Sequence, residues 1–298
     1  AYKFLYMKEN KKFRIIVLAK QVPDTRNVGK DAMKEDGTVN RAVLPAIYNP
    51  EDLNALELAL RIKDNNPDVE ILVLTMGPPR ASEIIRESLY RGADKGFLIT
   101  DMRFAGSDTL ATSYALAMAV KKLMPFDLVL SGRQAIDGDT AQVGPQIAEK
   151  LNIPQITYAE EITDINKNEI IVKRRLENGV EKVKSTLPAL VTVHSSAPDC
   201  RPRNAKLIMK FKHAHTPSEE VEKEYSEILN NRSSLIIEQW SVDDINAVTE
   251  MLGLSGSPTK VKKIENVVLQ HKESKVLTNF DEDIKGLMNE LISSHIIG

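Results

Sequence analysis

Cysteine is almost missing from this chain of 298 residues, in which Cys200 is the only one. A single thiol excludes a disulfide within the chain. It also excludes iron–sulfur or zinc sites built from cysteines of this chain alone. Because chains with so little cysteine are typical of reducing compartments, we expect this one in the cytoplasm.

An excess of charge of either sign is missing as well, since 40 Lys and Arg face 42 Asp and Glu. Proteins that bind nucleic acid through its phosphates usually carry a clear cationic excess, so we expect no nucleic acid partner. No apolar run approaches the roughly 20 residues that cross a bilayer. The start, "AYKFLYMKENKKF", lacks the continuous apolar core of a signal peptide. We therefore expect no membrane insertion.

Several motifs of catalysis and nucleotide binding are absent too. There is no G-x-G-x-x-G after the first predicted strand, no G-x-x-x-x-G-K-[ST] and no G-x-S-x-G. His213 and His215 lie in a basic stretch and are expected to be solvated, and His194 is expected to be packed at the end of a strand. We predict no catalytic residue and no metal site. Any chemistry would then belong to a bound cofactor.

Short apolar runs alternate with helical patterns from Phe13 to about Leu151. The runs are "FRIIVLAK", "VEILVLTMG", "GFLIT" and "FDLVLSG", and each is followed by a segment with helical spacing of its apolar residues. Such alternation predicts a mostly parallel sheet with helices on both faces, because parallel strands need crossover connections. The expected fold class is α/β, a Rossmann-like doubly wound sheet.

The pattern changes after Leu151. Two strand-like runs flank Asn178-Gly179, which is a strong hairpin signal, and "ALVTVHS" predicts one more buried strand. Further on, scattered helical patterns occur without an obvious sheet. We therefore expect an N-terminal extension over 1–13 and a nucleotide-binding α/β domain with a small β-hairpin addition over 14–197. A C-terminal helical arm over 198–298 would contact partner subunits.

Four loops follow the apolar runs of the predicted sheet: "AKQVPDT", "TMGPPRA", "TDMRFAGSDT" and "SGRQAIDGDT". In an open parallel sheet ligands bind beyond the carboxyl ends of the strands. The last two loops enter a helix through Ser-Asp-Thr or Gly-Asp-Thr, and the free N–H groups of a helix start suit an anion. Alternatively, the Asp is only an N-cap that stabilises the helix by about 1 kcal/mol. Pro145 predicts that the helix after Asp139 begins late or bends.

In order and spacing, these motifs resemble the β subunit of electron transfer flavoproteins. The matching stretches are "KQVPDT", "NPEDLNALELALRIK", "TMGPP" and "GRQAIDGDTAQVGPQIAEKL", and the likeness covers residues 14 to about 212. The resemblance implies a heterodimer with an electron transfer flavoprotein α subunit. It also implies an adenine nucleotide site in this chain. That site holds structural AMP in the electron-shuttling branch of the family and FAD in the electron-bifurcating branch.

Three stretches are similar to the bifurcating branch: "FAGSDTLATSYALAMA" at 104–119, "VPDT" at 22–25, and "DGDTAQVG" with Gly138 and Thr140. The resemblance then implies FAD as cofactor and NADH as hydride donor. One electron would pass through the α subunit's FAD to a flavin-dependent dehydrogenase of the lactate or acyl/enoyl-CoA type. The other would pass to ferredoxin or flavodoxin.

Two alternatives stay open. One is a non-bifurcating β subunit with AMP, and the other is a nucleotide-binding regulator of the universal stress protein type. The stretch "SSAPDCRPRNAK" departs from the family, since Ala205 stands where a bulkier leucine can occur. This departure argues against an ordinary acyl-CoA dehydrogenase as acceptor and for another one, such as a lactate dehydrogenase.

The loops and the resemblance, carried over by position, together imply a set of cofactor-binding residues at the strand ends. These are Leu18, Lys20, Val22, Pro23, Asp24, Asn49, Asp52, Met76, Gly77, Ala105, Ser107, Asp108, Thr109, Thr112, Gly132, Arg133, Gln134, Ala135, Asp137, Gly138, Asp139, Thr140, Gln142 and Val143.

Overall fold

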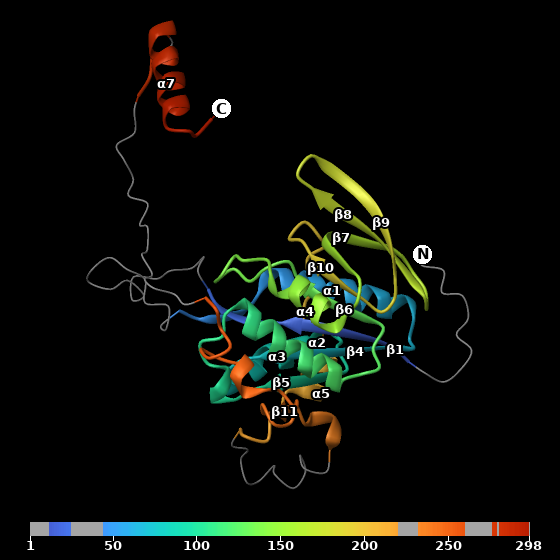
Figure 1. Ribbon diagram of the computed structural model, residues 1–298. Helices are drawn as coiled ribbons and strands as arrows, with labels where there is room; N and C mark the ends of the chain where they lie inside the picture. The colour runs from blue at the N-terminus through green and yellow to red at the C-terminus, as the bar shows by residue number, and fades with distance from the viewer. Residues whose placement is uncertain (1–11, 25–43, 220–231, 260–275, 279, 298) are drawn as a thin grey trace.

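One sheet of nine strands organises the computed structural model, which describes residues 12–24, 44–219, 232–259, 276–278 and 280–297 (Figure 1). In spatial order the strands are β11 (Glu238–Trp240), β5 (Lys95–Ile99), β4 (Val69–Met76), β1 (Phe13–Ala19), β6 (Leu128–Gly132), β10 (Ala189–Val193), β7 (Gln155–Ile165), β8 (Glu169–Leu176) and β9 (Gly179–Thr186). The strands from β11 to β7 pair in parallel, whereas β8 and β9 are antiparallel additions. The predicted Rossmann-like α/β fold is confirmed.

Helices cover both faces of the sheet. On one face lie α1 (Pro50–Asn65), α2 (Ser82–Arg91) and α5 (Ala205–Phe211), and on the other lie α3 (Thr109–Lys122) and α4 (Val143–Leu151). Alternation along β1 explains the two cores, since side chains on a strand point to opposite faces in turn. Ile15 and Val17 pack with α1 and α2, whereas Ile16 and Leu18 pack with α3 and α4.

Smaller elements complete the described part of the chain. They are β2 (Gln21–Pro23) and β3 (Ala46–Tyr48), which pair with each other, the short 3₁₀ helices at Pro79–Ala81, Met102–Phe104, Ser233–Leu235 and Thr249–Met251, and α7 (Asp281–Ser293). Nearly all of the expected extension over 1–13 lies outside the described residues, and β1 begins at Phe13.

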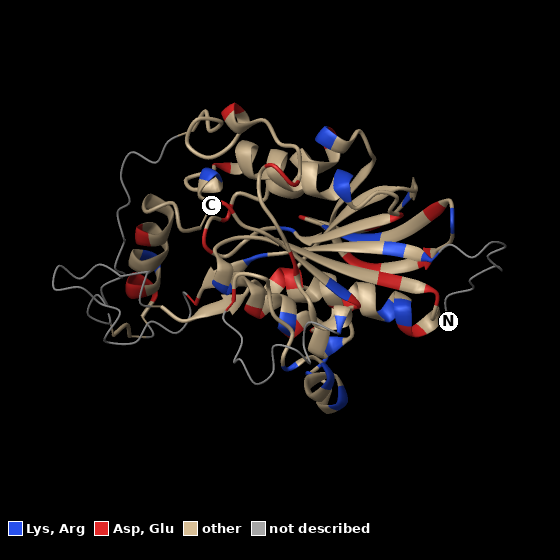
Figure 2. Ribbon diagram, turned by 90° about the horizontal axis from the view of Figure 1, so that it is seen from below, with Lys and Arg blue, Asp and Glu red and all other residues tan. Residues whose placement is uncertain are grey.

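The hairpin predicted around Asn178 is present as β8 and β9. Gly179 follows the turn with a φ of 156°, a conformation that residues with a Cβ rarely adopt. Both strands carry charges that pair across the hairpin, such as Arg174 with Glu181 and Lys184 with Glu169. Figure 2 shows Lys and Arg interspersed with Asp and Glu on these strands and over the rest of the fold.

Part of the C-terminal region packs on the same chain. β11 extends the sheet beside β5, and Trp240, Val242, Ile245 and Leu252 are buried in the core on the α3 and α4 side. No sequence pattern predicts this strand, because three residues are too few for a period to be visible. The boundary expected near residue 198 stays a prediction.

The last helix, α7, has no buried residue. Ile284, Met288 and Ile292 are exposed and spaced four residues apart, so they form an apolar stripe along it. None of the helices in the described ranges has the length and apolar character that crossing a bilayer requires.

Arg201 ties the loop after β10 to α1. Its backbone and guanidinium donate to the buried carboxylate of Glu57 at 2.9 to 3.1 Å, and its guanidinium also pairs with Asp64. Burial alone would raise the pKa of Glu57, but the bonds from Arg201 hold it below its usual value. This stabilisation is therefore present above the usual pKa of a glutamate and is lost as pH falls through the lowered one.

Arg201→Met should lower the free energy of unfolding at neutral pH by about 2 kcal/mol, because it leaves a buried carboxylate with fewer partners. Chemical denaturation measures this change. Arg203→Met is the matched control, since Arg203 is exposed and its replacement should cost less than about 0.5 kcal/mol. Equal stability of the two variants would contradict the role given to Arg201.

Candidate functional site

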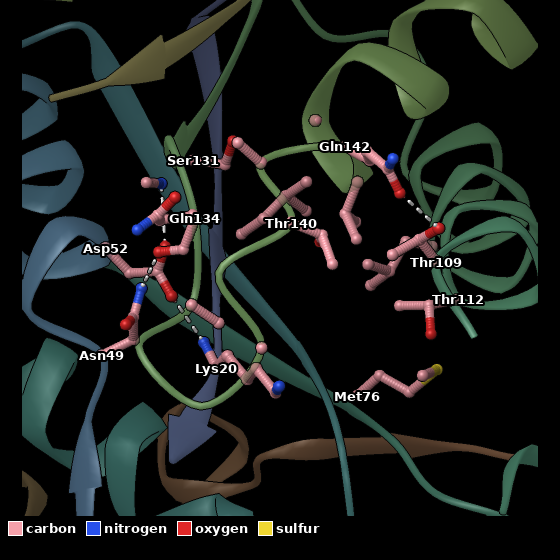
Figure 3. Close-up of a pocket in the computed structure, with 18 of the residues that line it drawn as sticks. Lys20, Asn49, Asp52, Met76, Thr109, Thr112, Ser131, Gln134, Thr140 and Gln142 are labelled. Atoms are coloured by element: carbon pink, nitrogen blue, oxygen red, sulfur yellow. Dashed lines mark hydrogen bonds between the residues drawn. The ribbon is translucent and has the colours of Figure 1, made fainter. Parts of the chain in front are cut away.

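A cavity of about 410 Å³ lies at the carboxyl ends of β1, β4 and β6. The chain continues from β1 to β4 on one side and later adds β6 on the other side of β1, so the strand order reverses here. This switch point is where open α/β sheets bind ligands. Figure 3 shows Asn49, Asp52 and Gln134 on one side of the cavity and Thr109 on the other, with Thr140 between them.

Most of the residues predicted from the sequence line this cavity. They are Leu18, Lys20, Asn49, Asp52, Met76, Ser107, Asp108, Thr109, Thr112, Gly132, Arg133, Gln134, Ala135, Gly138, Asp139, Thr140, Gln142 and Val143. The lining also includes Ala19, Phe104, Gly106 and Ser131 from the predicted loops and Ala141 beside them. Leu116 and Gly144, which no motif indicated, complete it.

The other predicted residues lie near the cavity without lining it. Val22 and Pro23 belong to β2, which pairs with β3, and the Asp24 amide donates to Pro45. The six predicted residues that do not line the cavity are Val22, Pro23, Asp24, Gly77, Ala105 and Asp137. Thr25, the last residue of "VPDT", lies outside the described residues.

Asp52, in the first turn of α1, joins the ends of two strands. Its carboxylate accepts the amide of Lys20 after β1 at 2.9 Å and the amide of Gly132 at the end of β6 at 2.8 Å. Burial raises the pKa of Asp52 to about 7, although the two amides act in the opposite direction. The side chain therefore fixes the spacing of the two loops that enter the cavity.

Two neighbours of Asp52 hold the loop after β6. The Asn49 side chain donates to the Gln134 carbonyl at 2.9 Å and accepts the Ile136 amide at 3.2 Å. Glu51 accepts the Gln134 amide at 3.0 Å and pairs with the guanidinium of Arg133 at 3.1 Å. The start of α1 thus acts as a scaffold for this loop.

The segment before α4 carries backbone amides that have no acceptor among the described residues. Asp139 and Ala141 have φ values of 50° and 52°, in the left-handed region, where residues with a Cβ are strained. No acceptor among the described residues takes the amide hydrogens of the five residues from Thr140 to Gly144. Free amides beside a helix start form an anion site.

α4 begins only at Val143, so the predicted late start is confirmed. Pro145 lies in the first turn, where a missing N–H costs no hydrogen bond. Asp139 does not cap this helix, since one of its carboxylate oxygens accepts from the side-chain amide of Gln134 at 2.7 Å.

The start of α3 differs, because its N-cap side chain already uses two amides. The Asp108 carboxylate accepts from Leu110 at 2.9 Å and from Ala111 at 3.0 Å. For Asp108 the N-cap alternative therefore describes the structure. Thr109 and Thr112 bring their hydroxyls to the cavity, and the hydroxyl of Thr109 donates to the Gln142 side chain at 3.0 Å, which links the two helix starts.

The cations near the cavity already have partners. The Lys20 ammonium pairs with Asp137 at 2.7 Å. Besides Glu51, the Arg133 guanidinium contacts the ring of Tyr158 at 5.4 Å, and that ring stacks on His194. The free donors toward a bound anion are thus mainly backbone amides and hydroxyls.

Ser131, the first residue of the predicted loop "SGRQAIDGDT", adds an unpaired hydroxyl. Its Oγ is buried and has no hydrogen-bond partner among the described residues. It lies under the first turn of α4, since a Cβ on Gly144 would come within 3.2 Å of it. Unpaired amides and a hydroxyl beside a cavity with an apolar side fit a phosphate-bearing ligand.

The chain is similar to a set of known proteins. Residues 36–223 match the family described as electron transfer flavoprotein domain. Over 285 residues the chain is 42% identical to caffeyl-CoA reductase-Etf complex subunit CarD of Acetobacterium woodii. The alignment covers 95% of this chain and 100% of that protein. Over 256 residues it is 44% identical to electron transfer flavoprotein subunit beta of Megasphaera elsdenii, covering 84% and 86% respectively. Over 295 residues it is 39% identical to acryloyl-CoA reductase electron transfer subunit gamma of Anaerotignum propionicum, covering 95% and 100%.

Proposed function

This chain belongs to the electron transfer flavoprotein family as a β-type subunit, and from that premise we propose that its cavity holds FAD rather than AMP. The observation that carries the proposal is the double set of donors. The five amides from Thr140 to Gly144 face no acceptor among the described residues, and Thr112 brings a hydroxyl to the opposite wall. A single phosphate needs donors from one wall of the cavity, whereas the two phosphates of a diphosphate use donors from both walls.

The residues of this chain would bind and orient the cofactor. The amides over 140–144 would hold phosphate oxygens, and Leu18, Met76, Phe104 and Leu116 offer an apolar side that suits a fused aromatic ring. When bound, FAD would accept a hydride from NADH and release the electrons singly, one through the α subunit's FAD to a dehydrogenase and one to ferredoxin or flavodoxin. The chain supplies position and electrostatics for this chemistry.

We propose the α subunit as the constant partner of this chain. The exposed apolar stripe of α7 supports an arm that packs on another subunit, because contiguous exposed apolar surface often marks an interaction site. The names of two similar proteins refer to caffeyl-CoA reductase and acryloyl-CoA reductase, which favours an acceptor of the acyl/enoyl-CoA type over a lactate dehydrogenase. Ala205, the residue that argued for another acceptor, begins α5 behind an Asn204 cap.

Family membership leaves the universal stress protein alternative without support. The AMP alternative is tested by the nucleotide content of the purified α–β complex, measured after denaturation and chromatography. We expect two FAD per heterodimer and rapid bleaching of the flavin by NADH. One FAD and one AMP per heterodimer, with no fast reaction with NADH, would refute the proposal and support a shuttling subunit.

A further inference from the structure

Residues 253–259, which we call the strap, lie against the loop that enters α3. The strap is about 150 positions away from that loop in sequence. The Gly253 amide donates to the Ser107 hydroxyl at 3.1 Å, and the Asp108 amide donates to the Ser257 hydroxyl at 2.8 Å. Thr259 donates to the Asp108 carboxylate twice, from its amide at 3.1 Å and from its hydroxyl at 2.6 Å.

The contact between strap and loop is also tight. Gly253 has a φ of 55°, and a Cβ there would lie 2.5 Å from the carbonyl oxygen of Arg103. Gly106, on the loop, has a φ of 75°, and its Cβ would lie 2.7 Å from the side chain of Leu254. Ser257 is only 4% exposed. Both surfaces thus depend on glycine for their close approach.

The carboxylate of Asp108 is shared between strap and helix. One oxygen caps α3 through the amides of Leu110 and Ala111, and the other accepts only from Thr259 among the described residues. Asp108 lines the cavity, so the donors on its carboxylate partly offset a negative charge that would repel a bound phosphate. Thr259 therefore both fixes the rotamer of Asp108 and offsets its charge.

We propose that Ser257 and Thr259 are positioning residues for the nucleotide, acting through Asp108 and the start of α3. The proposal rests on the proposed nucleotide site. Its consequence is that a segment from the C-terminal third of the chain controls the affinity of a cavity built by the N-terminal half.

The test uses the α–β heterodimer, stripped of nucleotide and dialysed against graded concentrations of free FAD. Flavin per heterodimer is read from absorbance, and the binding step that Gly132→Ala abolishes is assigned to this chain. Thr259→Val should raise the half-saturating concentration of that step about tenfold, because it removes one charge-assisted hydrogen bond. Thr259→Ser should bring the half-saturating concentration back to within about twofold of the wild-type value. Ser257→Ala should weaken binding in the same direction.

Thr249→Val is the matched control, since Thr249 is exposed and lies ten residues earlier. It should leave the half-saturating concentration unchanged, and all variants at 259 should melt at the temperature of this control. Unchanged affinity in Thr259→Val overturns the proposal. The proposal is also overturned if Thr259→Val loses affinity for FAD together with a lower melting temperature, and Thr259→Ser does not restore the affinity. A wild-type complex that takes up AMP and no second FAD would refute only the FAD proposal, and the same proteins titrated with AMP then decide the role of the strap.

Discussion

Replacing Asp52 with alanine should lower the free energy of unfolding by about 3 kcal/mol and empty the nucleotide site. The change removes the acceptor of the Lys20 and Gly132 amides, and each unpaired buried donor costs about 1 to 3 kcal/mol. Both loops that enter the cavity would then lose their spacing. Denaturant titration and the nucleotide content of the purified heterodimer measure the two effects.

Asp68→Ala is the control for Asp52→Ala, because Asp68 is exposed near the other end of α1. It should keep both the stability and the nucleotide within error of the wild type. A stable, nucleotide-loaded Asp52→Ala complex would contradict the account of the two strand ends.

The pH dependence gives a second signature of Asp52. Its folded pKa of about 7 lies above the ordinary 3.8, so between these values the folded state binds more protons than the unfolded state. The contribution of Asp52 is therefore fully present below the ordinary pKa. Above it, the free energy of unfolding falls by about 1.4 kcal/mol per pH unit until the folded pKa is reached. The difference curve between wild type and Asp52→Ala should show this slope.

Gly132→Ala should destabilise the fold by about 3 kcal/mol and abolish nucleotide binding, whereas Gly138→Ala in the same loop should change stability by less than about 0.5 kcal/mol. A Cβ on Gly132 would lie 2.4 Å from the Asp52 carboxylate and 2.8 Å from the backbone of the first turn of α1. That backbone has no room to move, because α1 packs on the sheet. A Cβ on Gly138 meets nothing within 4 Å.

Thermal melts and nucleotide content of the two glycine variants are compared on the α–β complex. Equal melting temperatures for the two variants would show that Gly132 is not confined by α1. Glycine at the end of β6 would then have no steric reason.

The sequence predicted the sheet because periodic patterns are local. Each apolar run and each helical segment is visible within about ten residues, and the position of the loops then follows from the parallel topology. Most of the loop over 131–144 lines the cavity, and its role in binding a cofactor stays a prediction. Gly144 was missed because it lies inside a helical pattern.

Contacts between distant segments could not be read in the same way. Val22 follows the first strand and was expected at the site, but its strand pairs with Ala46–Tyr48 beyond the cavity edge. The strap on Asp108 depends on a contact about 150 residues away, and no local pattern announces it. The positions of these segments depend on which distant strand or loop they contact, and a single sequence does not show such contacts.

The central claim is that free amides before and within the first turn of α4 hold the phosphates of the nucleotide. Hydrogen exchange of the heterodimer, stripped of nucleotide and then loaded with FAD, tests it most directly. We expect FAD to slow exchange at the five amides from Thr140 to Gly144, while those of Leu110 and Ala111, already bonded to Asp108, change little. Unchanged exchange over 140–144 on loading, with protection elsewhere in the chain, would contradict the account.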